Sequence, residues 1–118
     1  MTKIEEYILD KVRDHLGPAQ LETVIVYLDQ DLKHTGEQVS FGNVNVTLPW
    51  EGYIVFVDLD PKANWGHACS YFVIGQDSHE FLEIAAEMPP FLKAEASSFN
   101  LLNRGQLAPE WAVVTKPE

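Results

Sequence analysis

Two pairs of aspartates, each placed directly after an apolar run, are the first candidates for chemistry in this sequence. The first pair is Asp29 and Asp31, and the second is Asp58 and Asp60. In an extended chain, residues i and i+2 point to the same side, so each pair brings two carboxylates close together. Hard cations such as Ca²⁺ and Mg²⁺ prefer clustered carboxylate oxygens, so either pair could contribute to a metal site.

The second pair is the better candidate for a metal site. Asn64 and backbone carbonyls of the following turn could complete the coordination of a cation held by Asp58 and Asp60. The spacing differs from an EF-hand loop, because Lys62 stands where a third ligand is required and the sixth position is not glycine. The simpler interpretation is that the carboxylates are solvated at strand ends, where they limit edge pairing. We therefore expect no cofactor, with Ca²⁺ or Mg²⁺ as the alternative.

His67 and Cys69 form a His-x-Cys pair whose side chains share a face if the segment is extended. Both residue types bind zinc, but a structural zinc site needs four ligands and the sequence offers no second close pair. A nucleophilic Cys69 with His67 or His79 as its base is another interpretation. Because the segment is not basic and runs straight into the apolar residues 71–74, we expect Cys69 to be a buried, small hydrophobic residue.

The loop at 60–68 is the candidate for contact with a ligand or a partner. It contains Asn64, Trp65 and His67 between two predicted strands. Binding residues often lie on such loops, and large aromatic side chains are costly to leave in water. The alternative is that Trp65 folds back over the core, with its indole N–H bonded to a backbone carbonyl. A small enzyme whose pocket combines His67 with a nearby carboxylate or thiol is a third hypothesis.

A third group of acidic residues lies between 78 and 88. If this segment is a helix capped by Asp77, Glu80, Glu83 and Glu87 stand at i, i+3 and i+7 and form one acidic ridge. We favour the helix, although the same segment also alternates between apolar and polar residues as a strand would. The ridge would suit contact with a basic protein.

The overall charge narrows the classes of partner. The 118 residues include 18 acidic and 8 basic side chains, giving a formal net charge of −10. Such a chain is a poor ligand for nucleic-acid phosphates and for an anionic membrane. A basic protein partner is favoured, because opposite charges speed the encounter. With a single cysteine and no recognisable secretory leader, we expect a reducing cytoplasmic location.

The sequence lacks the compact motifs of the main enzyme classes. There is no P-loop, no Gly-x-Gly-x-x-Gly, no Gly-x-Ser-x-Gly and no His-Glu-x-x-His. The favoured function is therefore a non-catalytic protein-binding module that could neutralise a basic partner. A divalent-cation-binding domain and a small enzyme using 58–69 remain as alternatives.

The elements that must position these residues are read from hydrophobic periodicity and turn residues. Apolar residues recur with helical spacing near the N-terminus, behind Thr2 as a cap and before Gly17-Pro18 as a stop. The apolar phase of 38–48 changes at Gly42-Asn43, which is typical of a hairpin turn. The predicted elements are a helix at 3–16, a strand at 21–28, a hairpin of 37–41 against 44–48, strands at 53–57 and 69–74, loose helix at 91–104, and a last strand or ordered tail at 110–115.

These elements predict the fold class. With 46% hydrophobic residues, the chain can bury a core without a metal or a disulfide. We expect one α+β domain over 1–118, in which the N-terminal helix packs on an antiparallel, meander-like sheet of four to five strands. Short C-terminal helical segments should lie beside it.

Overall fold

The N-terminal helix α1 (Lys3–Leu16) begins where the sequence predicts it. In the computed structural model, which describes residues 1–41, 44–63, 66–77, 79–90 and 98–114, Thr2 and Glu5 form a reciprocal capping box. The helix ends at Gly17, whose φ of 89° is a conformation that favours glycine. Pro18 then starts the short helix α2 (Pro18–Leu21), so the first strand begins later than predicted.

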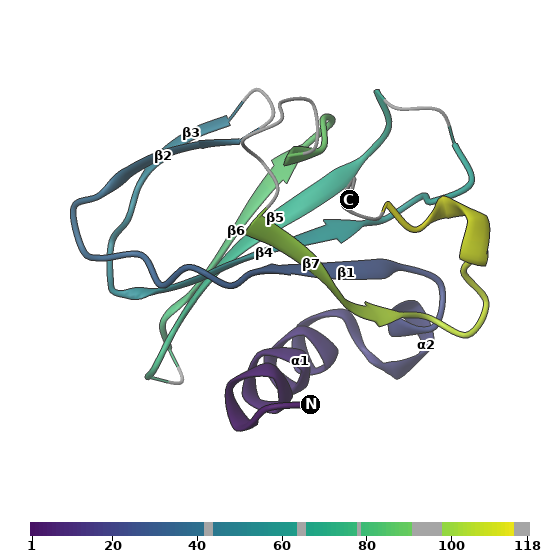
Figure 1. The fold of residues 1–118 in the computed structure, drawn as a ribbon, viewed down its shortest axis with the longest axis horizontal. Helices are drawn as coiled ribbons and strands as arrows, with labels where there is room; N and C mark the ends of the chain where they lie inside the picture. Colours follow the sequence, from purple (N-terminus) through teal and green to yellow (C-terminus); the bar gives the residue numbers. More distant parts are fainter. Residues whose placement is uncertain (42–43, 64–65, 78, 91–97, 115–118) are drawn as a thin grey trace.

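The main sheet has five strands in the order β6-β5-β4-β1-β7, each antiparallel to its neighbours (Figure 1). Its strands are β1 (Ile25–Asp29), β4 (Gly52–Asp58), β5 (Cys69–Gly75), β6 (Phe81–Ala86) and β7 (Phe99–Arg104). The predicted hairpin is confirmed: β2 (Gln38–Phe41) pairs with β3 (Val44–Thr47) as a separate two-stranded sheet. Within the main sheet, β1, β4, β5 and β6 are neighbours in chain order, with the β2–β3 hairpin inserted between β1 and β4, whereas β7 adds beside β1. The α+β prediction is confirmed.

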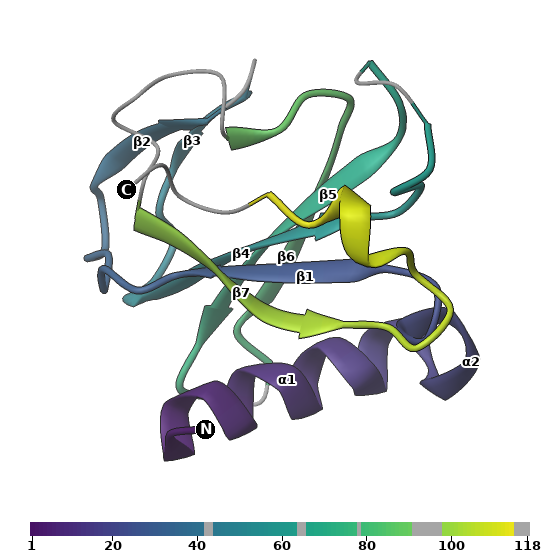
Figure 2. The same ribbon diagram turned by 45° about the vertical axis from the view of Figure 1, so that its right-hand side comes forward.

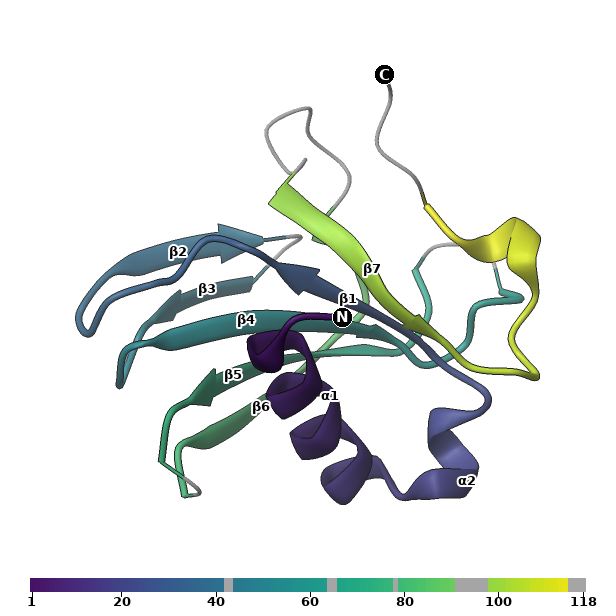
Figure 3. The same ribbon diagram turned by 60° about the horizontal axis from the view of Figure 1, so that its bottom comes forward.

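The main sheet is covered on both faces, which explains why nearly every residue of its central strands β4 and β5 is buried (Figures 2 and 3). Helix α1 covers one face and the β2–β3 hairpin lies over the other. The α1 side buries Ile8 and Val12 against Val26, Val55 and Val57. The hairpin side buries Tyr27, Phe56 and Tyr71, with Val39 and Val46 of the hairpin packed against them.

Two helical interpretations from the sequence are wrong. Residues 78–88 contain the strand β6, because pairing with β5 satisfies the hydrogen-bonding groups of its backbone. The alternation of apolar and polar residues in β6 also matches the two faces of the sheet. The end of 91–104 is the strand β7, which pairs with β1, while residues 91–97 lie outside the described residues. The C-terminal helical structure among the described residues is the 3-10 turn η3 (Glu110–Ala112). Within the same residues, no helix is long and apolar enough to cross a membrane.

Candidate functional site

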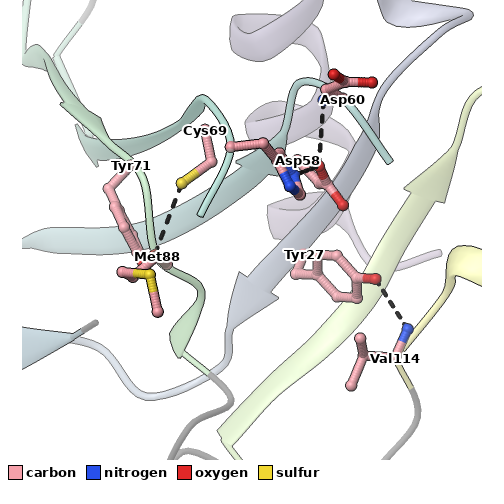
Figure 4. Close-up of polar contacts among 8 residues, drawn as sticks. Tyr27, Asp58, Asp60, Cys69, Tyr71, Met88 and Val114 are labelled. Carbon is pink, nitrogen blue, oxygen red and sulfur yellow. Dashed lines mark hydrogen bonds and ion pairs between the residues drawn. The ribbon is translucent and has the colours of Figure 1, made fainter. Parts of the chain in front are cut away.

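Asp58 is a buried carboxylate at the end of β4, and its oxygen is shared by two partners. Its Oδ1 lies 2.7 Å from Nε2 of His67. The same oxygen accepts the backbone N–H of Asp60 at 3.2 Å (Figure 4). The side chains of Asp58 and His67 are only 3% and 8% exposed. A buried carboxylate is costly unless it is paired and hydrogen-bonded, and this corner supplies both kinds of contact.

The first aspartate pair has the same local geometry at the end of β1. Oδ1 of Asp29 accepts the backbone N–H of Asp31 at 3.0 Å, and Oδ2 lies 3.4 Å from Nζ of Lys33. Each pair is thus an Asx turn in which the first carboxylate replaces a backbone acceptor where the strand ends. The spacing that suggested a cation site serves here to turn the chain.

The predicted metal ligands Asp58 and Asp60 do not point toward one another. Figure 4 shows the carboxylate of Asp60 directed away from Asp58, and Asp60 is exposed whereas Asp58 is buried. Among the residues that the structure describes, no group of three or more His, Cys, Asp or Glu side chains is placed to hold a metal ion. The predicted third contributor, Asn64, lies outside the described residues.

Cys69 lies beside Asp58 across the sheet and is buried, as the sequence predicts. Its Sγ lies 3.6 Å from the backbone oxygen of Met88, which also accepts the Tyr71 hydroxyl at 2.8 Å. Burial raises the pKa of the Cys69 thiol to about 11, and the negative charges of Asp58 and Glu87 add to the rise. A thiol with this pKa is protonated at neutral pH, which disfavours a nucleophilic role.

Tyr27 connects the same face of the sheet to the C-terminal segment. Its ring stacks near Phe56, with centroids 5.7 Å apart, and its hydroxyl oxygen accepts the backbone N–H of Val114 at 2.9 Å (Figure 4). Burial raises the pKa of Tyr27 to about 12, despite the opposing effect of the Val114 hydrogen bond. Tyr27 therefore remains a neutral phenol that anchors the end of the described chain.

The acidic ridge predicted for Glu80, Glu83 and Glu87 is wrong, because it required a helix. In β6 the Glu83 carboxylate lies 3.0 Å from His15 Nε2 and accepts the Ser70 hydroxyl at 3.1 Å. Glu80 turns back onto its own loop, where its Oε1 accepts the backbone N–H of Asp77. Glu80 precedes β6 and is held by its own loop, so the three carboxylates do not form the ridge that a helix would have made.

The predicted contact loop is only partly described. Asn64 and Trp65 lie outside the described residues. His67 is described, and its ring is buried against Asp58 rather than presented on the surface. The described part of this loop therefore contributes an internal contact.

A surface that the sequence analysis missed lies after β7. We call Leu107, Trp111, Glu22 and Glu110 the C-terminal surface. Leu107 is 65% exposed and Trp111 is 73% exposed, although both are large and apolar. The backbone carbonyl oxygen of Glu22 accepts the backbone N–H of Leu107 at 2.8 Å, and Glu110 precedes Trp111 in the sequence. The available signal was an isolated Trp-containing segment after Gly105, which the sequence analysis interpreted only as a strand or a tail.

No protein-family model, no curated protein and no solved structure matches this chain.

Proposed function

We propose that this protein is a non-catalytic module that binds a basic protein. The observation that carries the proposal is the imbalance of charge on the described surface. The exposed cations are Lys3, Arg13 and Lys62. The exposed carboxylates belong to Glu6, Asp10, Asp14, Glu22, Asp31, Glu51, Asp60, Asp77, Glu83, Glu87 and Glu110. Such a surface attracts a positively charged partner at long range and disfavours anionic ones.

The placement of the reactive groups also supports a binding role. Asp58 and His67 are buried against each other, and the thiol of Cys69 is buried with a raised pKa. A general base must reach the proton that it removes, and a nucleophile must be accessible and activated. These side chains are instead used in strand ends and core packing.

The proposal is tested by affinity capture with the whole chain. The immobilised protein is exposed to a lysate of its source cells at low ionic strength and then eluted with increasing salt. We expect a protein with a basic surface to be retained specifically and released as salt screens the attraction. The absence of a specifically retained protein, or retention of acidic proteins only, would overturn the proposal.

A charge variant provides the matched control. Glu6→Gln, Asp14→Asn and Glu87→Gln together remove three exposed carboxylates, two on α1 and one just after β6, and change little in volume. We expect this variant to fold and to release the captured protein at lower salt. Unchanged elution would show that the charge of the surface does not contribute to retention.

A further inference from the structure

We infer that the C-terminal surface is the docking site for a cationic, amphipathic segment of the partner, with Trp111 and Leu107 as its apolar anchors. This inference rests on the proposed function and adds the place and the chemistry of the contact. Tryptophan is among the residue types that contribute most to protein interfaces.

The two anchors are exposed because their neighbours pack inward. Ala108 is buried and Ala112 packs against the same apolar cluster on the hairpin side of the sheet. Leu107 and Trp111 directly precede these two alanines in the sequence. While the alanines pack inward, the two large side chains remain exposed to solvent. The structure thus holds apolar surface outward on a segment that is itself anchored.

The backbone of this segment is held at several points. Gly105 donates its N–H to Val24 at 2.9 Å, and Leu107 donates to Glu22. The Arg104 guanidinium donates to the carbonyl oxygens of Gly105 and Ala108 and lies 3.6 Å from the Glu110 carboxylate. A preorganised backbone lowers the entropy lost on binding, which favours recognition by an otherwise small surface.

The acidic residues beside Leu107 and Trp111 favour a cationic partner. Glu22 and Glu110 are exposed and lie beside Leu107 and Trp111 along the backbone, and against the single Arg104 guanidinium, which lies 3.6 Å from Glu110, they leave an excess of one negative charge. Lysine or arginine side chains flanking an apolar residue would match this arrangement. A second copy of the chain fits poorly, because a symmetric contact would bring the same carboxylates of two chains together.

The test uses a fluorescently labelled synthetic peptide of Lys and Leu with helical amphipathic spacing. Binding to the whole protein is followed by fluorescence anisotropy at low salt. One control peptide replaces Lys by Glu, and another replaces Leu by Ser. We expect only the Lys–Leu peptide to bind well, since recognition requires both the charge and the apolar face.

Surface variants locate the binding site. Trp111→Ser should weaken binding of the Lys–Leu peptide about 30-fold and Leu107→Ser about tenfold, as expected for interface anchors. Ile4→Ser is the matched control, because Ile4 is an exposed apolar residue of α1 outside this surface. It should leave the affinity unchanged. Circular dichroism verifies that each variant is folded.

Gly105→Ala tests the fixed backbone while keeping both anchors. A Cβ at this position would lie 2.3 Å from the Glu22 carbonyl oxygen, so the segment must shift. We expect weaker peptide binding by a folded Gly105→Ala protein. Binding equal to the wild type would remove the preorganisation step of the inference.

The outcomes separate the docking site from the proposed function. If the Lys–Leu and Lys–Ser peptides bind equally well, and Trp111→Ser has no effect, the docking site is wrong while a basic partner remains supported. If the Lys–Leu peptide does not bind the wild type, the inference is also overturned. Affinity capture then decides the proposed function independently.

Discussion

Two corners of the main sheet use the same Asp-x-Asp turn but differ in the side chain that meets the buried carboxylate. At the end of β1, Lys33 lies four residues after Asp29 and 3.4 Å from its oxygen. At the end of β4, His67 lies nine residues after Asp58 and only 2.7 Å from it. The first contact is local, whereas the second ties the β4–β5 loop to the sheet. The same Asp-x-Asp turn therefore makes only a local contact at the end of β1 but joins a loop to the sheet at the end of β4.

The surroundings of the two corners differ as well. The backbone of Lys33 exchanges two hydrogen bonds with Gly52, at 2.9 and 3.0 Å, so the Asp29 corner is fixed without its ion pair. The Asp58 carboxylate is buried, and its negative charge contributes to the raised pKa values of Tyr27 and Cys69. The Asp58 corner should therefore be more sensitive to substitution and to alkaline pH.

The largest expected difference is in stability. Asp58→Ala should lower the free energy of unfolding by about 3 kcal/mol, because it leaves a buried imidazole and a backbone N–H without this acceptor. Asp29→Ala should cost about 1 kcal/mol, because Lys33 is less buried and can reach water. Urea unfolding measures both values. Asp58→Asn, which keeps an acceptor oxygen for the turn, should lose less than Asp58→Ala. Equal losses at the two corners would contradict the comparison.

The second difference is the response to alkaline pH. The folded state raises the pKa of Cys69 from its ordinary value of 9.0 to about 11, so folding favours the protonated thiol. The resulting stability is present below pH 9 and is lost as the pH rises toward 11, by about 2 kcal/mol. Urea unfolding at several pH values measures this decline. Cys69→Ala should flatten it between pH 9 and 11, and an identical decline in that variant would contradict the assignment.

The smallest expected effect concerns the thiol itself. Asp58→Asn should lower the pKa of Cys69 by less than about one unit, because burial is the larger cause of the rise and the nearby charge the smaller one. Thiolate absorbance, taken as a difference from Cys69→Ala, gives the midpoint. Asp29→Asn serves as the control and should leave the midpoint unchanged. A shift caused equally by both substitutions would show that the charge of Asp58 has no specific role.

The elements that the sequence predicts best are those whose signals are local. The phase change at Gly42-Asn43 predicts the β2–β3 hairpin, and Thr2 with Glu5 predicts the start of α1. The apolar runs of β4 and β5 identify central strands, because both faces of the sheet are covered. In each case nearby residues suffice to define the structure.

The elements that the sequence predicts poorly depend on distant partners. Residues 81–86 fit a helix and a strand almost equally, and pairing with β5 decides between them. Ser98 and Asn100 do not indicate a strand, yet β7 forms along the edge of β1, which lies about seventy residues earlier in the sequence. Tertiary pairing overrides weak local preference in both strands.

The sequence predicted which residues form the candidate site better than it predicted what those residues do. Spacing alone brought attention to Asp58, Asp60 and His67, but it could not show that one carboxylate would be buried and the other exposed. The exposure of Trp111 depends on Ala108 and Ala112 packing inward beside a strand that the sequence did not reveal. Surfaces of this kind emerge from the assembled fold.

The most direct test is a single anisotropy titration of the Lys–Leu peptide against the wild type, Asp58→Asn and Trp111→Ser, each verified as folded. We predict that Asp58→Asn binds as the wild type does, because the buried corner supports the fold, and that Trp111→Ser binds about 30-fold more weakly. Loss of binding in Asp58→Asn, with full binding in Trp111→Ser, would contradict the division between a structural corner and a binding surface.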